Sequence, residues 1–285
     1  LGQVFDVGHY EKLFGSADFG SAVTAGFLTR QGADMAFAHA LVHEAIYTSM
    51  TRSERLRLHG RVADYFRDID VVLWADHALA ARAPDMARAC AAAADILLPQ
   101  HLLEAGQRYI EAGLESSPDP DTRGLLLHCR GSLKRERGDL SAALEDYRAA
   151  AEGYVSPGVR AQVLARQAWV HRLQGDLETA DLCMAQASAI PDDQLSADLR
   201  SEILNQLGAQ AFARSDHAAC LDLNRRARDI AEGALYRSRA LGGIGDAHYA
   251  AGRMRSAWHA YRECIALARE AGLGLVELNH GFMEA

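Results

Sequence analysis

The feature that most constrains this sequence is a turn that recurs four times in its second half. Each copy starts with a small residue, and a helical pattern resumes directly after it. The four copies are Gly138-Asp139-Leu140, Gly175-Asp176-Leu177, Ser215-Asp216-His217 and Gly252-Arg253-Met254. Successive copies stand 37, 40 and 37 residues apart. Such a period is typical of stacked helical hairpins, each too small to bury its apolar face alone, so the sequence predicts a repeat scaffold.

Small residues also recur at fixed places inside each unit. Seven residues before the turns stand Gly131, Ala168, Gly208 and Gly245. Five residues after the turns stand Ala143, Ala180, Cys220 and Ala257. Antiparallel helices cross closely only where side chains are small, so we expect these two sets to face each other across each hairpin. The pattern resembles the tetratricopeptide repeat over roughly residues 120 to 270, which implies an all-α, tetratricopeptide-like α-solenoid of helix hairpins.

Composition limits the classes of function. The net charge of −8 argues against nucleic acid or an anionic membrane as the main partner. The five cysteines form no C-x-x-C pair, so we expect small buried thiols in a reducing compartment. The sequence contains no run of 18 apolar residues and no signal peptide, and we therefore expect a cytoplasmic location.

The first 70 residues are not repeat-like. Short helices are predicted over residues 10–14 and 19–28, and the turn Gln31-Gly32-Ala33-Asp34 favours a small β-hairpin. A helix over residues 39–50 and another over residues 53–68, with Ser53 as N-cap, complete this region. Together they predict a small winged-helix-like domain with a short β-hairpin.

One motif in this region resembles that of a known family. The stretch from Phe37 to Tyr47, with Arg55 to His59 downstream, resembles the signature F-x-H-x-L-x-x-[ED]-x-x-Y…R-x-x-L-H. That signature closes the ATPase module of bacterial AAA-like signal-transducing ATPases, in which tetratricopeptide-like repeats follow. Such proteins are often joined to class III adenylate or guanylate cyclase domains or to LuxR-type regulator domains. The resemblance implies a lid over residues 1–70, a repeat array over residues 71–285 and an upstream ATPase module that uses ATP and ADP.

The resemblance also implies that His39 is the nucleotide-sensing residue. An imidazole at the start of a helix lies beside unpaired amides, a combination that suits a phosphate oxygen. The alternative is that His39 only caps and packs its helix. The chain has no G-x-x-x-x-G-K-[ST] loop, so we expect no useful ATP binding by this chain alone. It also shows no catalytic constellation, so we expect it not to be an enzyme, whereas an ATPase or cyclase activity of the longer protein stays open.

Two other readings of the same region are less favoured. His39, His43 and Glu44 follow the order H-x-x-x-H-E, which is not a zincin motif, and two ligands make no catalytic zinc site, so we expect no metal. The helix over residues 39–50 has no Lys or Arg, so we also expect no direct contact with nucleic acid.

Between the lid and the clear repeats, the sequence predicts a divergent first repeat and a half. An Ala-rich helical pair over residues 71–83 and 85–97 is broken at Pro84. Pro99 then opens a helix over residues 100–115, because proline suits a first helical turn.

In a superhelix of such hairpins, the first helix of each unit lines the concave face. Positions on that face supply a mixed set of aromatic, arginine and amide side chains, which are usual anchors of recognition. The predicted contact residues are Arg135, Trp169, Arg172, Asn205, Phe212 and Tyr249. They would contact a protein or peptide partner, or a small effector. The alternative is that Trp169 and Phe212 pack between adjacent units.

Both ends suggest an internal piece of a longer protein. The chain starts at Leu1 without a methionine, and a further first helix starts near Gly274 and stops at Ala285 without its partner helix. We expect a sensor and interaction segment that couples partner or effector binding to a nucleotide-dependent switch. A plain adaptor without a switch and a part of an adenylate or guanylate cyclase are the alternatives.

Overall fold

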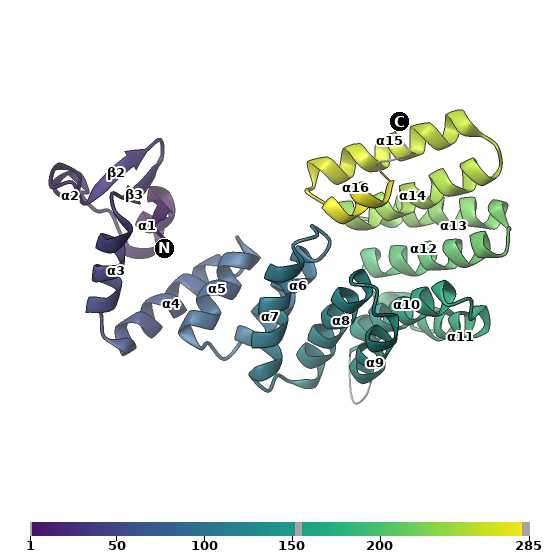
Figure 1. Cartoon of the computed structure of the whole chain (residues 1–285), viewed down its shortest axis with the longest axis horizontal. Helices are drawn as coiled ribbons and strands as arrows, with labels where there is room; N and C mark the ends of the chain where they lie inside the picture. Colours follow the sequence, from purple (N-terminus) through teal and green to yellow (C-terminus); the bar gives the residue numbers. More distant parts are fainter. Residues whose placement is uncertain (1, 152–155, 281–285) are drawn as a thin grey trace. The chain divides into compact units, whose positions relative to one another are not determined.

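The structure, a computed structural model, describes residues 2–151 and 156–280 (Figure 1). By its contacts the chain forms two compact units, Leu1–Ala93 and Ala94–Ala285, and each is described by itself. The division lies inside helix α6, Met86–Leu97. Helix α5, Val71–Ala81, and most of α6 belong to the first unit by their contacts, and the sequence-based domain boundary at residue 70 stays a prediction.

The first unit carries a small antiparallel sheet. Its strands are β1, Val4–Asp6; β2, Leu28–Gln31; and β3, Asp34–Phe37. They lie in the order β1-β3-β2, with Val4 opposite Ala36 and Leu28 opposite Phe37. Gly32 has φ 64° in the turn of the predicted hairpin, which only glycine adopts at no steric cost. The sheet buries Phe5, Leu28 and Met35 against neighbouring aromatic rings.

Five helices of the first unit surround or follow this sheet. They are α1, Val7–Phe14; α2, Gly20–Thr24; α3, Ala40–Ser49; α4, Arg52–Phe66; and α5, Val71–Ala81. The helix predicted over residues 19–28 is shorter, because Leu28 pairs in the sheet. Ser53 is not the N-cap of α4. Thr51 takes that place, since its side chain accepts the Glu54 N–H while the Glu54 carboxylate accepts the Thr51 N–H at 2.8 Å.

The second unit is a series of helical hairpins, and Figure 1 shows their stacking in chain order. Its helices after α6 are α7, Leu103–Glu115; α8, Pro120–Glu136; α9, Leu140–Ala151; α10, Pro157–Leu173; α11, Leu177–Ser188; α12, Ala197–Ala213; α13, His217–Ile230; α14, Ala234–Ala250; α15, Met254–Glu270; and α16, Gly274–His280. The prediction of an all-α, tetratricopeptide-like solenoid preceded by a small winged-helix-like domain is confirmed. The predicted start of α7 near Gln100 is wrong, because His101 adopts a left-handed φ of 64° before the helix begins. The predicted end of the last helix, at 281–285, lies outside the described residues.

The four recurrent turns share one backbone geometry. Their first residues have positive φ angles of 84° at Gly138, 80° at Gly175, 62° at Ser215 and 72° at Gly252. In three of them, the aspartate that follows caps the second helix by accepting a backbone N–H at 3.0 to 3.1 Å. The small residue therefore ends one helix in the left-handed region, and the aspartate begins the next.

Close contact within a hairpin depends on an aromatic ring over a glycine. A Cβ added to Gly131 would lie 2.6 Å from the ring of Tyr147, and one added to Gly245 would lie 2.5 Å from the ring of Tyr261. We expected Ala143 and Ala257 opposite these glycines. The nearest side chains are instead the tyrosines four residues later, whose rings are almost fully buried.

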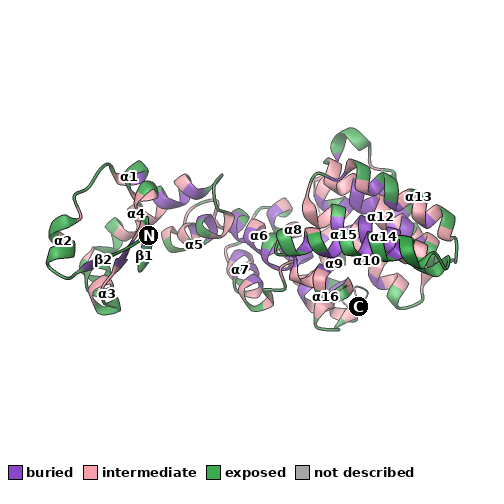
Figure 2. Ribbon diagram, turned by 90° about the horizontal axis from the view of Figure 1, so that it is seen from above, coloured by how far each residue is buried: buried purple, intermediate pink, exposed green. Residues whose placement is uncertain are grey.

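Core clusters extend from three of the hairpins to the helix that follows, as expected of repeats that stabilise their neighbours. One cluster joins α10 and α11 to Ile203 of α12. Figure 2 shows buried residues on α12 and α14 inside the second unit. All five cysteines are buried, as the sequence predicted. None of the helices in the described ranges is long and apolar enough to cross a membrane.

Candidate functional site

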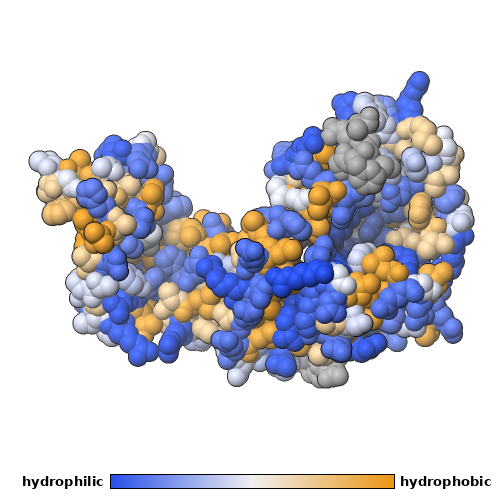
Figure 3. Space-filling view, in the orientation of Figure 1, coloured by the Kyte–Doolittle hydropathy of each residue, from blue (hydrophilic) through white to orange (hydrophobic). Residues whose placement is uncertain are grey.

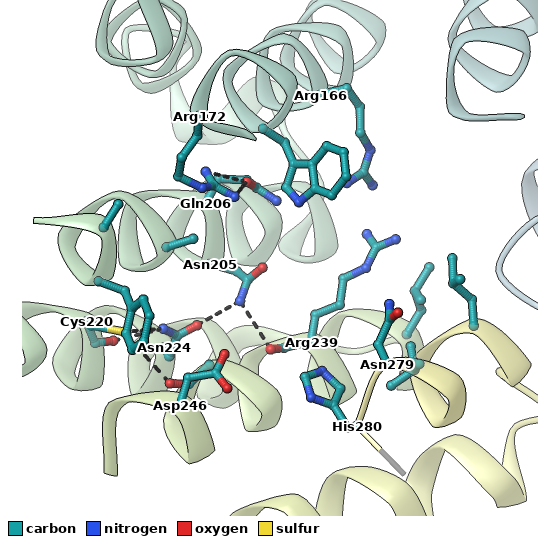
Figure 4. A pocket seen from close by; sticks show the side chains of 18 of the residues that line it. Arg166, Arg172, Asn205, Gln206, Cys220, Asn224, Arg239, Asp246, Asn279 and His280 are labelled. Atoms are coloured by element: carbon teal, nitrogen blue, oxygen red, sulfur yellow. Dashed lines mark hydrogen bonds between the residues drawn. The ribbon is translucent and has the colours of Figure 1, made fainter. Parts of the chain in front are cut away.

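A cavity of about 550 Å³ lies among the first helices of successive hairpins in the second unit (Figure 4). Its walls come from α8, α10, α12, α14 and α16, with a contribution from α13. Figure 3 shows hydrophilic side chains around the hollow of this unit. Small-molecule sites in proteins commonly have volumes of this order, and a solenoid forms one because its first helices share a concave side.

Five of the six predicted contact residues lie in the wall of this cavity. They are Arg135, Trp169, Arg172, Asn205 and Phe212. The sixth, Tyr249, is 53% exposed and is not among the described residues that line the cavity. The structure thus brings most of the set together, and contact with a partner or effector stays a prediction.

Trp169 takes part in both packing and the cavity wall. It packs against the core cluster of α8, α9 and α10, while the guanidinium carbon of Arg135 lies 4.5 Å from its ring centroid. Arg135 also forms an ion pair with its neighbour Glu136. Phe212 is 39% exposed, and its ring lies 5.6 Å from that of His217. The packing of Trp169 is thus observed, and its part in recognition stays a prediction.

A buried ionic cluster lies beside the cavity, and its two arginines, Arg166 and Arg239, line the cavity wall. Glu202 of α12 accepts from Arg166 of α10 and from Arg239 of α14, each at 2.8 Å. Burial alone would raise the pKa of Glu202, but the two guanidinium groups outweigh it and lower that pKa to about 2. One carboxylate thus joins three successive units, because its two oxygens contact different neighbours.

Sequence reasoning missed Glu202, although a signal was present. Glu202 and Arg239 each stand six residues before the small residue of their first helix, Gly208 and Gly245. Opposite charges at equivalent places in successive repeats lie at one height of a solenoid, where they can pair. Comparing charges between units in this way would have indicated the pair.

Amide side chains extend the cluster across the cavity. Arg172 donates from two guanidinium nitrogens to Gln206 Oε1, both at 3.3 Å, and Gln206 Nε2 donates to Glu202 at 3.1 Å. Asn205 Nδ2 donates to Asn224 Oδ1 at 2.7 Å. These hydrogen bonds between side chains hold the amides of the wall in place.

Behind this wall, Asp95, His128 and Cys129 place possible metal-ligand atoms within 4.8 Å of one another. Both ring nitrogens of His128 are buried without a hydrogen-bond partner. Burial, followed by repulsion from Arg166, lowers the pKa of His128 to about 3. The same positive charge opposes a divalent cation, so we do not assign a metal to this group.

The buried His128 predicts a pH dependence of stability. Its pKa is about 3 in the folded chain and 6.5 in the unfolded chain, so the unfolded state binds more protons between these values. Stability is therefore expected to fall as the pH falls from 6.5, by about 2 kcal/mol at pH 5. Urea unfolding at pH 7 and pH 5 should show this loss, and His128→Met should reduce it. The exposed His259→Met is the matched control, and equal pH dependence in both variants would contradict the assignment.

In the first unit, His39 is the N-cap residue of α3, with φ −139° and an exposed side chain that makes no capping hydrogen bond. An apolar pocket of about 330 Å³ is lined by five residues of the family-like motif, Phe37, Tyr47, Arg55, Leu58 and His59, whereas Leu41 and Glu44 do not line it. There Arg55 donates to the backbone oxygen of Tyr47 at 3.3 Å, and the Tyr47 hydroxyl lies 2.9 Å from Nε2 of His59. Contacts within the first unit thus account for Tyr47, Arg55 and His59 of the motif. His39 takes no part in these contacts.

Comparisons with known proteins agree with a tetratricopeptide-like solenoid. No family model matches the chain. Over 98 residues the chain is 33% identical to a TPR repeat-containing protein of Synechococcus elongatus, a match that covers 34% of this chain and 23% of that protein. The matched region thus spans less than a quarter of this curated relative.

Two solved structures share the fold. One is a Signal Transduction ATPase with Numerous Domains (STAND) protein with a tetratricopeptide repeat sensor from Pyrococcus horikoshii, at a TM-score of 0.70 and 13% identity, covering 99% of this chain and 44% of that one. The other is from the APC/C hetero-tetramer Cut9-Hcn1, at a TM-score of 0.52 and 15% identity, covering 84% of this chain and 49% of that one. The chain spans less than half of either structure, and these identities show the fold alone.

Proposed function

We propose that this chain is the sensor and coupling segment of a larger signalling ATPase. A protein or peptide partner, or a small effector, binds the concave side of the repeats, and the first unit passes this state to an ATPase module that binds ATP and ADP. The observation that carries the proposal is the cavity, because its walls come from first helices of successive hairpins. Binding there changes how neighbouring repeats pack, which is how a solenoid responds to a ligand.

The first unit supports the link to a nucleotide switch. The fold of nearly the whole chain, sheet-bearing unit and repeats together, resembles that of a STAND protein with a tetratricopeptide repeat sensor. His39 at the start of α3 has an exposed imidazole that is not used for capping. It is therefore available to bond a phosphate oxygen of a nucleotide held by another module.

Titration calorimetry of ADP and ATP on the full-length protein tests this proposal. His39→Ala is expected to weaken ADP at least tenfold while changing ATP less, because a sensor bonds one nucleotide state more strongly. His259→Ala, an exposed histidine of α15, is the matched control. If the full-length protein binds neither nucleotide, or if His39→Ala behaves as the control does, the switch is contradicted.

Failure of that test would favour the second candidate, a plain adaptor. The repeats would then bind a protein partner with no nucleotide switch, a role for which the solenoid of helical hairpins suffices. Only the first proposal includes an output domain in the larger protein. That domain would be a cyclase, a LuxR-type regulator domain or another domain.

A further inference from the structure

The wall of the large cavity holds more positive than negative charge. Arg166 and Arg239 share the single carboxylate of Glu202. The guanidinium of Arg172 donates to the neutral amide oxygen of Gln206, and Glu202 acts on it only from beyond ion-pair distance among the described residues. Three guanidinium groups therefore lie near Glu202 on this side of the cavity, and Asp95 is a second carboxylate that acts on Arg166 and Arg239.

The other acids of the cavity do not offset this surplus. Glu136 is paired with Arg135. Asp246 accepts the Tyr261 O–H at 2.6 Å and forms no ion pair with Arg172 or Arg239 among the described residues, while burial raises its pKa. The neighbouring His280 is partly buried, and its burial lowers its own pKa. A positive surplus near Arg172 and Arg239 remains.

These guanidinium groups are costly to bury without an anion. Burial lowers the pKa of both Arg172 and Arg239, which means that the surroundings disfavour their charge. A planar guanidinium bonds carboxylate and phosphate oxygens in pairs, and such charge-assisted bonds are stronger in a cavity than in water. Figure 4 shows Arg172 and Arg239 extending from opposite walls of the same space.

We propose that this cavity binds a small organic anion whose carboxylate or phosphate group is held by Arg172 and Arg239. The inference rests on the proposed function and names the effector class of its site. The volume of about 550 Å³ fits a small molecule, and Trp169 and Phe212 offer apolar wall to the remainder of that molecule. Asn205 and Asn279 add neutral polar groups for its orientation.

Titration calorimetry of the 285-residue chain tests the proposal with two probes, succinate for the carboxylate and inorganic phosphate for the phosphate. At least one probe is expected to bind, and the one that binds tighter identifies the anionic group. Arg172→Gln is expected to weaken that probe at least tenfold. Arg172→Lys keeps the charge and loses the planar fork. Its affinity for the probe is expected to lie between that of the unchanged chain and that of Arg172→Gln.

Arg225→Gln is the matched control, because Arg225 is exposed on α13 and does not line the cavity. Thermal unfolding of each variant checks that the fold persists, and sodium chloride at equal ionic strength checks for unspecific screening. Binding of neither probe overturns the inference, as does an Arg172→Gln chain that binds as tightly as the Arg225→Gln chain. The nucleotide titrations of the full-length protein are a separate experiment, so each idea can fail alone.

Discussion

Replacing Glu202 by Gln is expected to lower the free energy of unfolding by about 3–5 kcal/mol, because it leaves two buried guanidinium groups without their carboxylate. Glu202 is 3% exposed and bonds Arg166 and Arg239 at 2.8 Å. Glutamine has nearly the same shape, so the loss reports charge rather than volume. Urea denaturation followed by circular dichroism measures it.

The matched control for Glu202→Gln is Glu263→Gln, at an exposed position of α15. We expect the control to change stability by less than about 0.5 kcal/mol. A loss of less than about 1 kcal/mol for Glu202→Gln would show that the cluster is not the electrostatic connection between α10, α12 and α14 that the structure indicates.

Replacing Gly245 by Val is expected to destabilise the second unit by about 3 kcal/mol, because the new side chain meets a ring that cannot move. A Cβ at Gly245 would lie 2.5 Å from the ring of Tyr261. That ring is 2% exposed, and its hydroxyl is held by Asp246 at 2.6 Å. Thermal unfolding of the chain measures the effect.

Gly60→Val in α4 is the control for this prediction. A Cβ there would meet its nearest neighbour, the Cβ of Ala81, at an ordinary contact distance of 3.9 Å. Since valine is the better helix former, we expect Gly60→Val to be neutral or slightly stabilising. The close crossing of α14 and α15 would be contradicted if both substitutions had the same effect.

The repeat architecture could be predicted because its signals are local and recur. A positive φ favours Gly at the turn, and three of the four turns have it, while the fourth keeps its place in the period with Ser215. The ladder of small residues predicted close helix crossings, although the side chain over Gly131 is that of Tyr147 and not of Ala143. The position of each small residue in the repeat was thus predictable, and the side chain that contacts it was not.

The other features of the fold and the site could not be predicted from the sequence. They depend on a choice between two possible N-cap residues or on contacts between residues far apart in the sequence. Thr51 and Ser53 are both able to cap α4, and only Thr51 has Glu54 at the spacing of a capping box. Strand β1 has three residues, too few for a period to appear, and its pairing with β3 exists only in the folded unit. The meeting of Arg172, Glu202 and Arg239 follows from the stacking of three repeats.

Hydrogen exchange of the 285-residue chain with and without the tighter-binding probe, succinate or inorganic phosphate, is the most direct test of the claim that the concave cavity is the recognition site. We expect that probe to slow exchange in peptides from α10, α12 and α14, which carry Arg172, Asn205 and Arg239. Arg172→Gln should remove that protection. Unchanged exchange in all three helices, or protection confined to the first unit, would contradict the claim.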